Sequence, residues 1–406
     1  MRRLLRLIAS TALPLFMGVS AFGQHYTQTN LVSNTPGAAE ASDPKLVNAW
    51  GLARTSASVW WVADQATGVA TLYNGPGEKQ SLVVTIPPAD PSNKKTPIGS
   101  PTGTVSNSTT DFLLAAGDPA IFIFATADGS IAAWNPKVAL AKGAAAPSTH
   151  AVTAVKTSDG SVYTGLTISS IEGKRYLYVA NFTKGRVDVY DNAFHRVDLH
   201  QVHSHHDHHD DFAFDDDNYS RGEEPFADER LPRDFVPFNV AAIGGDIVVT
   251  YVLHQEGSMF ETDGPGLGFV DIFDSTGHLL RRLEHGPWLN APWGVALAPL
   301  DFGRFSHDLL IGQFAGGGTT ESSGFIAAYD LATGKFDGLL EDASGKPLAI
   351  NGIWSLSPAN FAPASADPDE EPAAEVYFTA GPKQGAGGLF GYLNAVSTDL
   401  LEGSDQ

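Results

Sequence analysis

A unit that recurs six times along the chain constrains the fold more than any other feature of the sequence. In the first copy, a short strand around Gly51 (48–52) is followed by an apolar strand (59–64) that ends in Asp. A glycine and a strand ending in an aromatic residue plus Asn come next (68–74), and a fourth strand covers 81–86. Strands of this kind are β-branched and aromatic and are bounded by Gly, Pro, Asn and Asp, which predicts an all-β protein.

The copies share one register, in which equivalent positions are occupied by Gly51, Gly103, Gly165, Asn239, Gly294 and Ser355. The intervals are long enough for four strands each, and helical periodicity is nearly absent outside 137–146. A four-stranded unit cannot bury both of its faces alone, but copies packed around an axis can. We therefore predict a six-bladed β-propeller, built as a single domain over 24–396.

The sixth copy shows only three strands, whereas the segment 26–32 near the start of the chain forms a strand that belongs to no copy. We predict that this N-terminal strand completes the last blade and closes the ring. Counting five or seven blades requires one copy to be merged or split. A pair of β-sandwiches is the alternative fold, and the shared register argues against it.

The first 23 residues have the features of a secretory signal peptide. Arg2, Arg3 and Arg6 precede an apolar run over 7–22, and small residues follow near the expected cleavage before Gln24. The run is too short to span a membrane, and no later segment is suited to it. We expect a periplasmic or secreted protein without a membrane span, ending in a short tail over 397–406. Because the chain has no cysteine, its stability must come from core burial rather than disulfides.

The chain is strongly acidic, with a formal net charge of -21 that includes the three arginines of the signal. Nucleic acid binding depends on cationic contacts with phosphates, so we exclude a nucleic acid partner. Acidic surfaces favour solubility, and they also suit cationic ligands or divalent metals. We expect a monomer whose partner is a small molecule or a protein.

Several segments resemble an uncharacterised family of exported bacterial proteins that has the appearance of NHL-type propellers. The most specific are DPKLVNAWG (43–51), FIFATADG (122–129) and APWGVALAP (291–299), and the resemblance covers about Asn30 to Leu393. It implies export and a propeller fold. The family offers no established activity or catalytic residues to transfer, and the sequence departs from its pattern over 199–224.

That departure is an insert rich in His and Asp. Imidazole and carboxylate groups together suit zinc, nickel or copper(II). Their spacing matches no fixed motif, and the simpler interpretation is a solvated loop that binds metal weakly. The candidate ligands are His203, His205, His206, His208, His209, Asp210 and Asp211.

A second set of candidates comes from the repeat register. Polar and Trp residues recur where the innermost strands begin and where the next strands end, so the ring could gather them at one rim of the central channel. Alternatively, the Asn and Asp residues complete turns and the Trp residues pack between blades. The candidates are Asn48, Trp50, Asp64, Thr126, Asn181, Asn239, Trp293, Gln313 and Trp354.

The sequence contains no nucleophile elbow, phosphate-binding loop or His-Glu-x-x-His motif. We therefore expect a non-enzymatic binding or scaffold protein with no certain cofactor. One alternative is a metal-dependent hydrolase or lactonase, with an axial calcium or zinc ion held by Asp64, Asn181 and their neighbours. That alternative depends on analogy between folds. Another is capture of metal ions by the insert.

Overall fold

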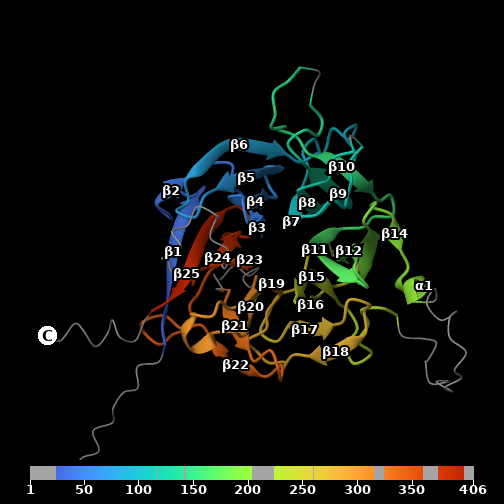
Figure 1. The fold of residues 1–406 in the computed structure, drawn as a ribbon. Helices are drawn as coiled ribbons and strands as arrows, with labels where there is room; N and C mark the ends of the chain where they lie inside the picture. The colour runs from blue at the N-terminus through green and yellow to red at the C-terminus, as the bar shows by residue number, and fades with distance from the viewer. Residues whose placement is uncertain are drawn as a thin grey trace, which may run out of the picture.

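A computed structural model describes residues 24–115, 117–140, 143–203, 224–258, 260–314, 324–359 and 374–396. Within these residues, six β-sheets stand side by side around a central axis, each with one edge strand at the axis (Figure 1). The helical elements in the described residues are α1 (Leu199–His203) and η1 (Gly303–Phe305). The predicted six-bladed β-propeller is confirmed, and the alternative of two sandwiches is excluded.

The first five blades follow the order of the chain, each running from the axis outward through antiparallel neighbours. The first blade consists of β3 (Ala49–Ala53), β4 (Trp60–Asp64), β5 (Val69–Tyr73) and β6 (Lys79–Thr85), and the second of β7 (Pro101–Ser106), β8 (Phe122–Thr126), β9 (Ser130–Trp134) and β10 (Val152–Lys156). The third consists of β11 (Tyr163–Ile171), β12 (Lys174–Asn181), β13 (Arg186–Asp191) and β14 (Arg196–Val197), and the fourth of β15 (Phe235–Ile243), β16 (Asp246–Leu253), β17 (Gly268–Phe273) and β18 (Leu279–Arg282). The fifth consists of β19 (Pro292–Leu297), β20 (Leu309–Gln313), β21 (Ile326–Tyr329) and β22 (Phe336–Leu339).

The sixth blade joins the two ends of the described chain. Its strands are β23 (Ile353–Pro358), β24 (Val376–Ala380), β25 (Leu389–Ala395), β1 (Tyr26–Ser33) and the short β2 (Ala41–Ser42). β1 runs antiparallel to β25, with Tyr26 opposite Ala395, and the blue and red strands lie together in Figure 1. The prediction that the N-terminal strand closes the last blade is confirmed.

This closure removes an unpaired strand edge and buries apolar surface. Tyr26, Leu31 and Val32 of β1 are buried. The Tyr26 hydroxyl donates a 3.0 Å hydrogen bond to the carbonyl of Phe302, which belongs to the fifth blade. β1 therefore connects the sixth blade to its neighbour as well as completing it, and it covers the β25 edge that would otherwise be free to pair with another chain.

The shared glycine register marks the place where the innermost strands come closest. A Cβ atom on Gly51 would lie 2.5 Å from the carbonyl oxygen of Thr102, and one on Gly103 would lie 2.9 Å from the Cα of Gly165. A Cβ on Gly165 would overlap the side-chain oxygen of Asn239. Neighbouring backbones thus touch around the axis, which requires glycine at these three positions, whereas Asn239 and Ser355 carry side chains at theirs. We call this ring of register positions the waist.

Large apolar side chains fill the space between blades farther from the axis. Trp61 of the first blade, for example, stacks on Phe122 of the second with ring centroids 4.1 Å apart. Such contacts bury both faces of each sheet. This burial explains why the strands appear in the sequence as continuous apolar runs and not as alternating apolar and polar residues.

Nothing helical in the described part of the chain is long and apolar enough to cross a lipid bilayer. The predicted signal peptide (1–23) and tail (397–406) lie outside the described residues, as does most of the His- and Asp-rich insert.

Candidate functional site

Two cavities lie along the axis, one on each side of the waist. The smaller one has a volume of about 320 Å³. It is lined by aliphatic and small residues of the inner strands, among them Leu52, Val105, Leu166, Val240 and Leu356. We call it the aliphatic cavity. Its lining contains no charged side chain among the described residues.

The larger cavity, of about 560 Å³, lies where the innermost strands begin. All six blades contribute to it, through these strand starts and through the connections between the second and third strands. We call it the aromatic cavity. Its lining residues are Asn48, Trp50, Gln65, Ala127, Val162, Thr164, Phe182, Phe238, Phe260, Glu261, Asp263, Phe314, Trp354, Gln384 and Gly385.

Stacked aromatic rings form one wall of the aromatic cavity. Trp354 of the sixth blade stacks on Trp50 of the first, with ring centroids 3.7 Å apart. It also stacks on Phe314 of the fifth blade at 4.1 Å. Trp293 meets Trp354 edge-on at 6.0 Å. These rings come from strands or connections far apart in the sequence, so only closure of the ring brings them together.

A chain of hydrogen bonds holds the polar part of the wall. The Trp354 indole donates from Nε1 to Oδ1 of Asn48 over 2.8 Å. Asn48 donates from Nδ2 to Gln65 Oε1 over 3.0 Å, and Gln65 donates to the Ser100 hydroxyl over 2.6 Å. Asn48 has a φ of 49°, a left-handed conformation that Asn tolerates better than most residues. The side chains are thus oriented before any ligand arrives.

Two polar atoms in this lining have no hydrogen-bond partner among the described residues. They are the indole Nε1 of Trp50 and the hydroxyl Oγ1 of Thr164, and both are buried. A buried donor or acceptor without a partner costs about 1–3 kcal/mol. Both atoms have almost no accessible surface, so they lie behind the cavity wall and do not face the open space.

The acidic side of the cavity comes from the connection between β16 and β17, residues 254–267. Glu261 and Asp263 line the cavity, and Phe260 beside them is 72% exposed. Burial raises the pKa of the Glu261 carboxyl, and the neighbouring charge of Asp263 raises it further. Perturbed carboxyls of this kind gather at functional sites.

The nine rim candidates from the sequence divide into three groups. Asn48, Trp50 and Trp354 line the aromatic cavity. Asn239 and Trp293 line the aliphatic cavity. The remaining candidates are buried within the blades and line neither cavity; they are Asp64, Thr126, Asn181 and Gln313.

Two of the buried candidates accept hydrogen bonds from backbone N–H groups at the ends of strands. The hydroxyl of Thr126 accepts a 2.9 Å hydrogen bond from the backbone N–H of Ser130. The side-chain oxygen of Gln313 accepts a 2.8 Å bond from the backbone N–H of Asn290. These contacts are the ones that polar strand ends make when they stabilise connections.

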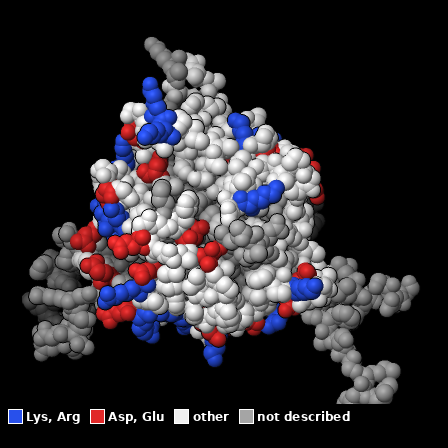
Figure 2. Space-filling view, turned by 180° about the vertical axis from the view of Figure 1, so that it is seen from behind, with Lys and Arg blue, Asp and Glu red and all other residues white. Residues whose placement is uncertain are grey.

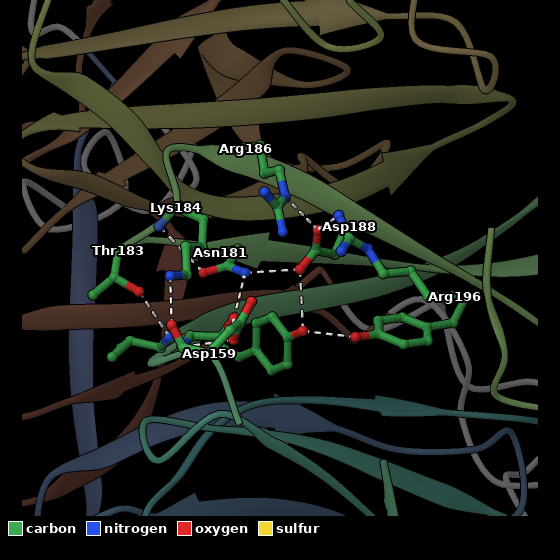
Figure 3. A network of polar contacts seen from close by, with 11 residues as sticks. Asp159, Asn181, Thr183, Lys184, Arg186, Asp188 and Arg196 are labelled. Carbon is green, nitrogen blue, oxygen red and sulfur yellow. Dashed lines mark hydrogen bonds and ion pairs between the residues drawn. The ribbon is translucent and has the colours of Figure 1, made fainter. Parts of the chain in front are cut away.

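Asn181 belongs to a polar network inside the third blade (Figure 3). It donates from Nδ2 to Asp188 over 2.7 Å and to the hydroxyl of Ser161 over 2.9 Å. Arg186 and Arg196 each approach the other Asp188 oxygen at 2.7 Å. The buried Asp188 carboxylate is therefore paired with two cations, as a buried charge requires.

Asp64 is the most isolated of the four. Its Oδ2 accepts a 2.7 Å hydrogen bond from the Thr71 hydroxyl, and its Oδ1 has no partner among the described residues. Burial raises the pKa of this carboxyl well above its usual value. Thr71 belongs to the same blade, so Asp64 is held within the sheet.

The described residues contain no group of three or more His, Cys, Asp or Glu side chains that could hold a metal ion. Of the insert candidates, His203 ends α1, and the other six lie outside the described residues. Metal binding by the insert therefore stays a prediction. So does the axial ion assigned to Asp64 and Asn181.

Sequence reasoning missed the segment 260–263. Its one signal was length, because the connection 254–267 is much longer than the equivalent 182–185 in the third blade. Extended loops on a rigid scaffold frequently carry function. Neither the path of this loop nor the direction of its carboxyl groups follows from a repeat register.

The described surface carries charges of both signs. On the face shown in Figure 2, acidic side chains gather at one side of the molecule with basic side chains interspersed among them. The net charge of -21 is the balance of these two kinds of side chain over the whole sequence, 25 basic against 46 acidic.

The ring of sheets and its axial cavity define the chain as a six-bladed β-propeller. No protein-family model matches it. The chain is similar to two uncharacterised proteins of Acanthamoeba polyphaga mimivirus. The first is 26% identical over 372 residues, covering 89% of this chain and 84% of the relative. The second is 26% identical over 369 residues, covering 89% and 78%.

Among solved structures, a Bacteroides thetaiotaomicron protein of unknown function matches 92% of this chain and 76% of its own, with a TM-score of 0.50 and 10% identity. Similarity at this level shows the fold alone. Membership of the exported bacterial family that the sequence resembles stays a prediction.

Proposed function

We propose that the chain is a non-enzymatic binding protein of the periplasm or the extracellular space, and that it holds a small organic molecule in the aromatic cavity. Of the sequence candidates, Asn48, Trp50 and Trp354 contact that molecule. Export is supported by the basic and apolar start of the sequence.

The observation that carries the proposal is the make-up of the aromatic cavity, where aromatic rings stand beside polar side chains that hydrogen bonds already orient. Asn48 and Gln65 supply these polar groups, held by the bonds from Trp354 to Asn48 and from Asn48 to Gln65. The cavity volume of about 560 Å³ falls in the range of small-molecule sites. Mostly apolar walls with a few oriented polar groups are typical of such sites.

The test uses a cavity-filling variant. Ala127 is half-buried in the lining, so Ala127→Phe would occupy the cavity without disturbing the core. Ala57→Phe adds the same side chain at an exposed position in the connection between β3 and β4. Both variants and the unchanged protein are titrated with a panel of small organic cations, anions and neutral compounds.

Intrinsic tryptophan fluorescence reports binding, because Trp50 and Trp354 lie in the wall. We expect at least one compound to give a saturable change with the unchanged protein and Ala57→Phe, and none with Ala127→Phe. Equal binding to all three proteins, or no binding across the panel, would refute the proposal.

A further inference from the structure

We infer that the molecule bound in the aromatic cavity is an organic cation, an amine or a quaternary ammonium compound. This inference depends on the proposed function, since it names the chemical class of that ligand. It follows from the charges of the lining and from its aromatic walls.

The charges in the lining are of one sign. Glu261 and Asp263 contribute carboxyl groups, whereas no Lys, Arg or His is among the described residues that line the cavity. The charge that acts most on Glu261 is Asp263, which is itself acidic. Placing two carboxyl groups in one partly buried cavity is unfavourable, and a cation in the same cavity would be attracted by both of them.

The aromatic walls favour the same ligand. Trp354 is stacked between Trp50 and Phe314, which cover its two faces. A cation would therefore meet other rings of the lining, among them Phe182 and Phe238. The faces of aromatic rings are electron-rich, so each suitably placed ring attracts a cation by roughly 0.5–2 kcal/mol. Several aromatic rings beside a carboxylate make the arrangement that recognises ammonium groups.

The anionic and neutral alternatives fit less well. An anion would meet Glu261 and Asp263 with no basic side chain in the described lining. A neutral ligand of the same shape could occupy the apolar walls, but it would leave the repulsion between the two carboxyl groups unchanged. Charge therefore decides between otherwise similar ligands, and the experiment should vary charge alone.

Choline and 3,3-dimethylbutan-1-ol differ in one atom, the quaternary nitrogen that is replaced by carbon. Isothermal titration of the full chain with each compound measures the effect of the charge. We expect choline to bind about tenfold or more tightly than the neutral alcohol. Ala127→Phe should abolish the binding of both compounds.

The contribution of Glu261 is tested by Glu261→Gln, which keeps the shape and removes the charge. Glu256→Gln is the matched control, because Glu256 is exposed in the same connection and does not line the cavity. We expect Glu261→Gln to weaken choline binding about fivefold without changing that of the alcohol, and Glu256→Gln to change neither.

Equal affinities for choline and the alcohol would overturn the cation inference and leave the cavity as a binding site. Choline binding that survives in Ala127→Phe or is unchanged in Glu261→Gln would also overturn it. If neither compound binds while other members of the panel do, only the ligand class is wrong. If nothing in the panel binds, the proposed function fails as well.

Discussion

The indole Nε1 of Trp354 donates a 2.8 Å hydrogen bond to the side-chain oxygen of Asn48, 306 residues earlier in the chain. The bond joins the sixth blade to the first beside the closure of the ring, and it forms part of the aromatic cavity. Structure and proposed binding therefore depend on the same contact. The predictions below separate the stability of the ring from the properties of the site.

Replacing Asn48 tests this contact directly. Asn48→Gly adopts the left-handed backbone conformation without strain, but it leaves the buried Trp354 N–H without its acceptor. This loss should destabilise the fold by about 1–3 kcal/mol. Asn48→Ala should cost about 1 kcal/mol more, because Ala is strained at this φ. Urea unfolding followed by tryptophan fluorescence measures both variants, and equal midpoints would contradict the strain argument.

The close contacts at the waist predict that replacement by Ala destabilises the fold at one glycine and not at another. Gly165→Ala places a methyl group against the side chain of Asn239, so we expect a loss of about 1–3 kcal/mol or failure to fold. Gly245→Ala is the matched control, because its added Cβ would have no heavy atom within 4 Å. Thermal unfolding should separate the two variants clearly, and a stable Gly165→Ala protein would show that the strands can move apart at the axis.

Closure by β1 predicts that the N-terminal strand is essential for the sixth blade. Removing residues 24–34 takes away the buried Tyr26, Leu31 and Val32, each worth about 1.5–3 kcal/mol of burial. It also exposes the β25 edge. We expect a large fall in the unfolding temperature and self-association by light scattering. A synthetic peptide of the same residues should reverse part of both effects, and a truncated protein as stable as the full chain would show that β1 is dispensable.

The buried carboxyl of Asp64 predicts a dependence of stability on pH. Burial raises its pKa in the folded state above that of the unfolded chain, so the folded state binds the proton more tightly. This contribution to stability is complete below the unfolded pKa of about 4 and is lost as pH rises toward the folded pKa. Asp64→Asn cannot ionise, so the variant should be more stable than the unchanged protein at neutral pH and less sensitive to pH above 4.

The control for Asp64 is Glu229→Gln, which removes one negative charge from an exposed position. It should leave the slope of unfolding free energy against pH nearly unchanged. A parallel slope for Asp64→Asn and the unchanged protein, measured by urea unfolding between pH 4 and pH 8, would show that Asp64 does not titrate in this way.

Much of the fold could be predicted from local patterns. The strands are short, apolar and bounded by turn residues, and the same register returns in every copy. The number of blades and the closure of the ring could therefore be predicted from the repeats. The glycines of that register were recognised in the sequence only as equivalent positions of the repeats. The close contacts of Gly51 and Gly165 show that they allow the innermost strands to approach one another around the axis.

The candidate site could be predicted only in part. The starts of the innermost strands indicated Asn48, Trp50 and Trp354, which line the aromatic cavity. The ends of the following strands indicated Asp64 and Asn181, whose side chains instead bond within their own blades. Equal position in a repeat does not fix which way a side chain turns at the end of a strand.

The sequence alone determined the six repeats, the unassigned first strand and the aromatic residues near the axis, because these depend on short-range alternation and on turn chemistry. Only the tertiary structure decided which polar groups meet in the cavity and which form hydrogen bonds inside the blades. Glu261 shows the reason. It lies in an irregular connection whose path depends on the blades around it, and burial together with the charge of Asp263 raises its pKa only once the ring has closed.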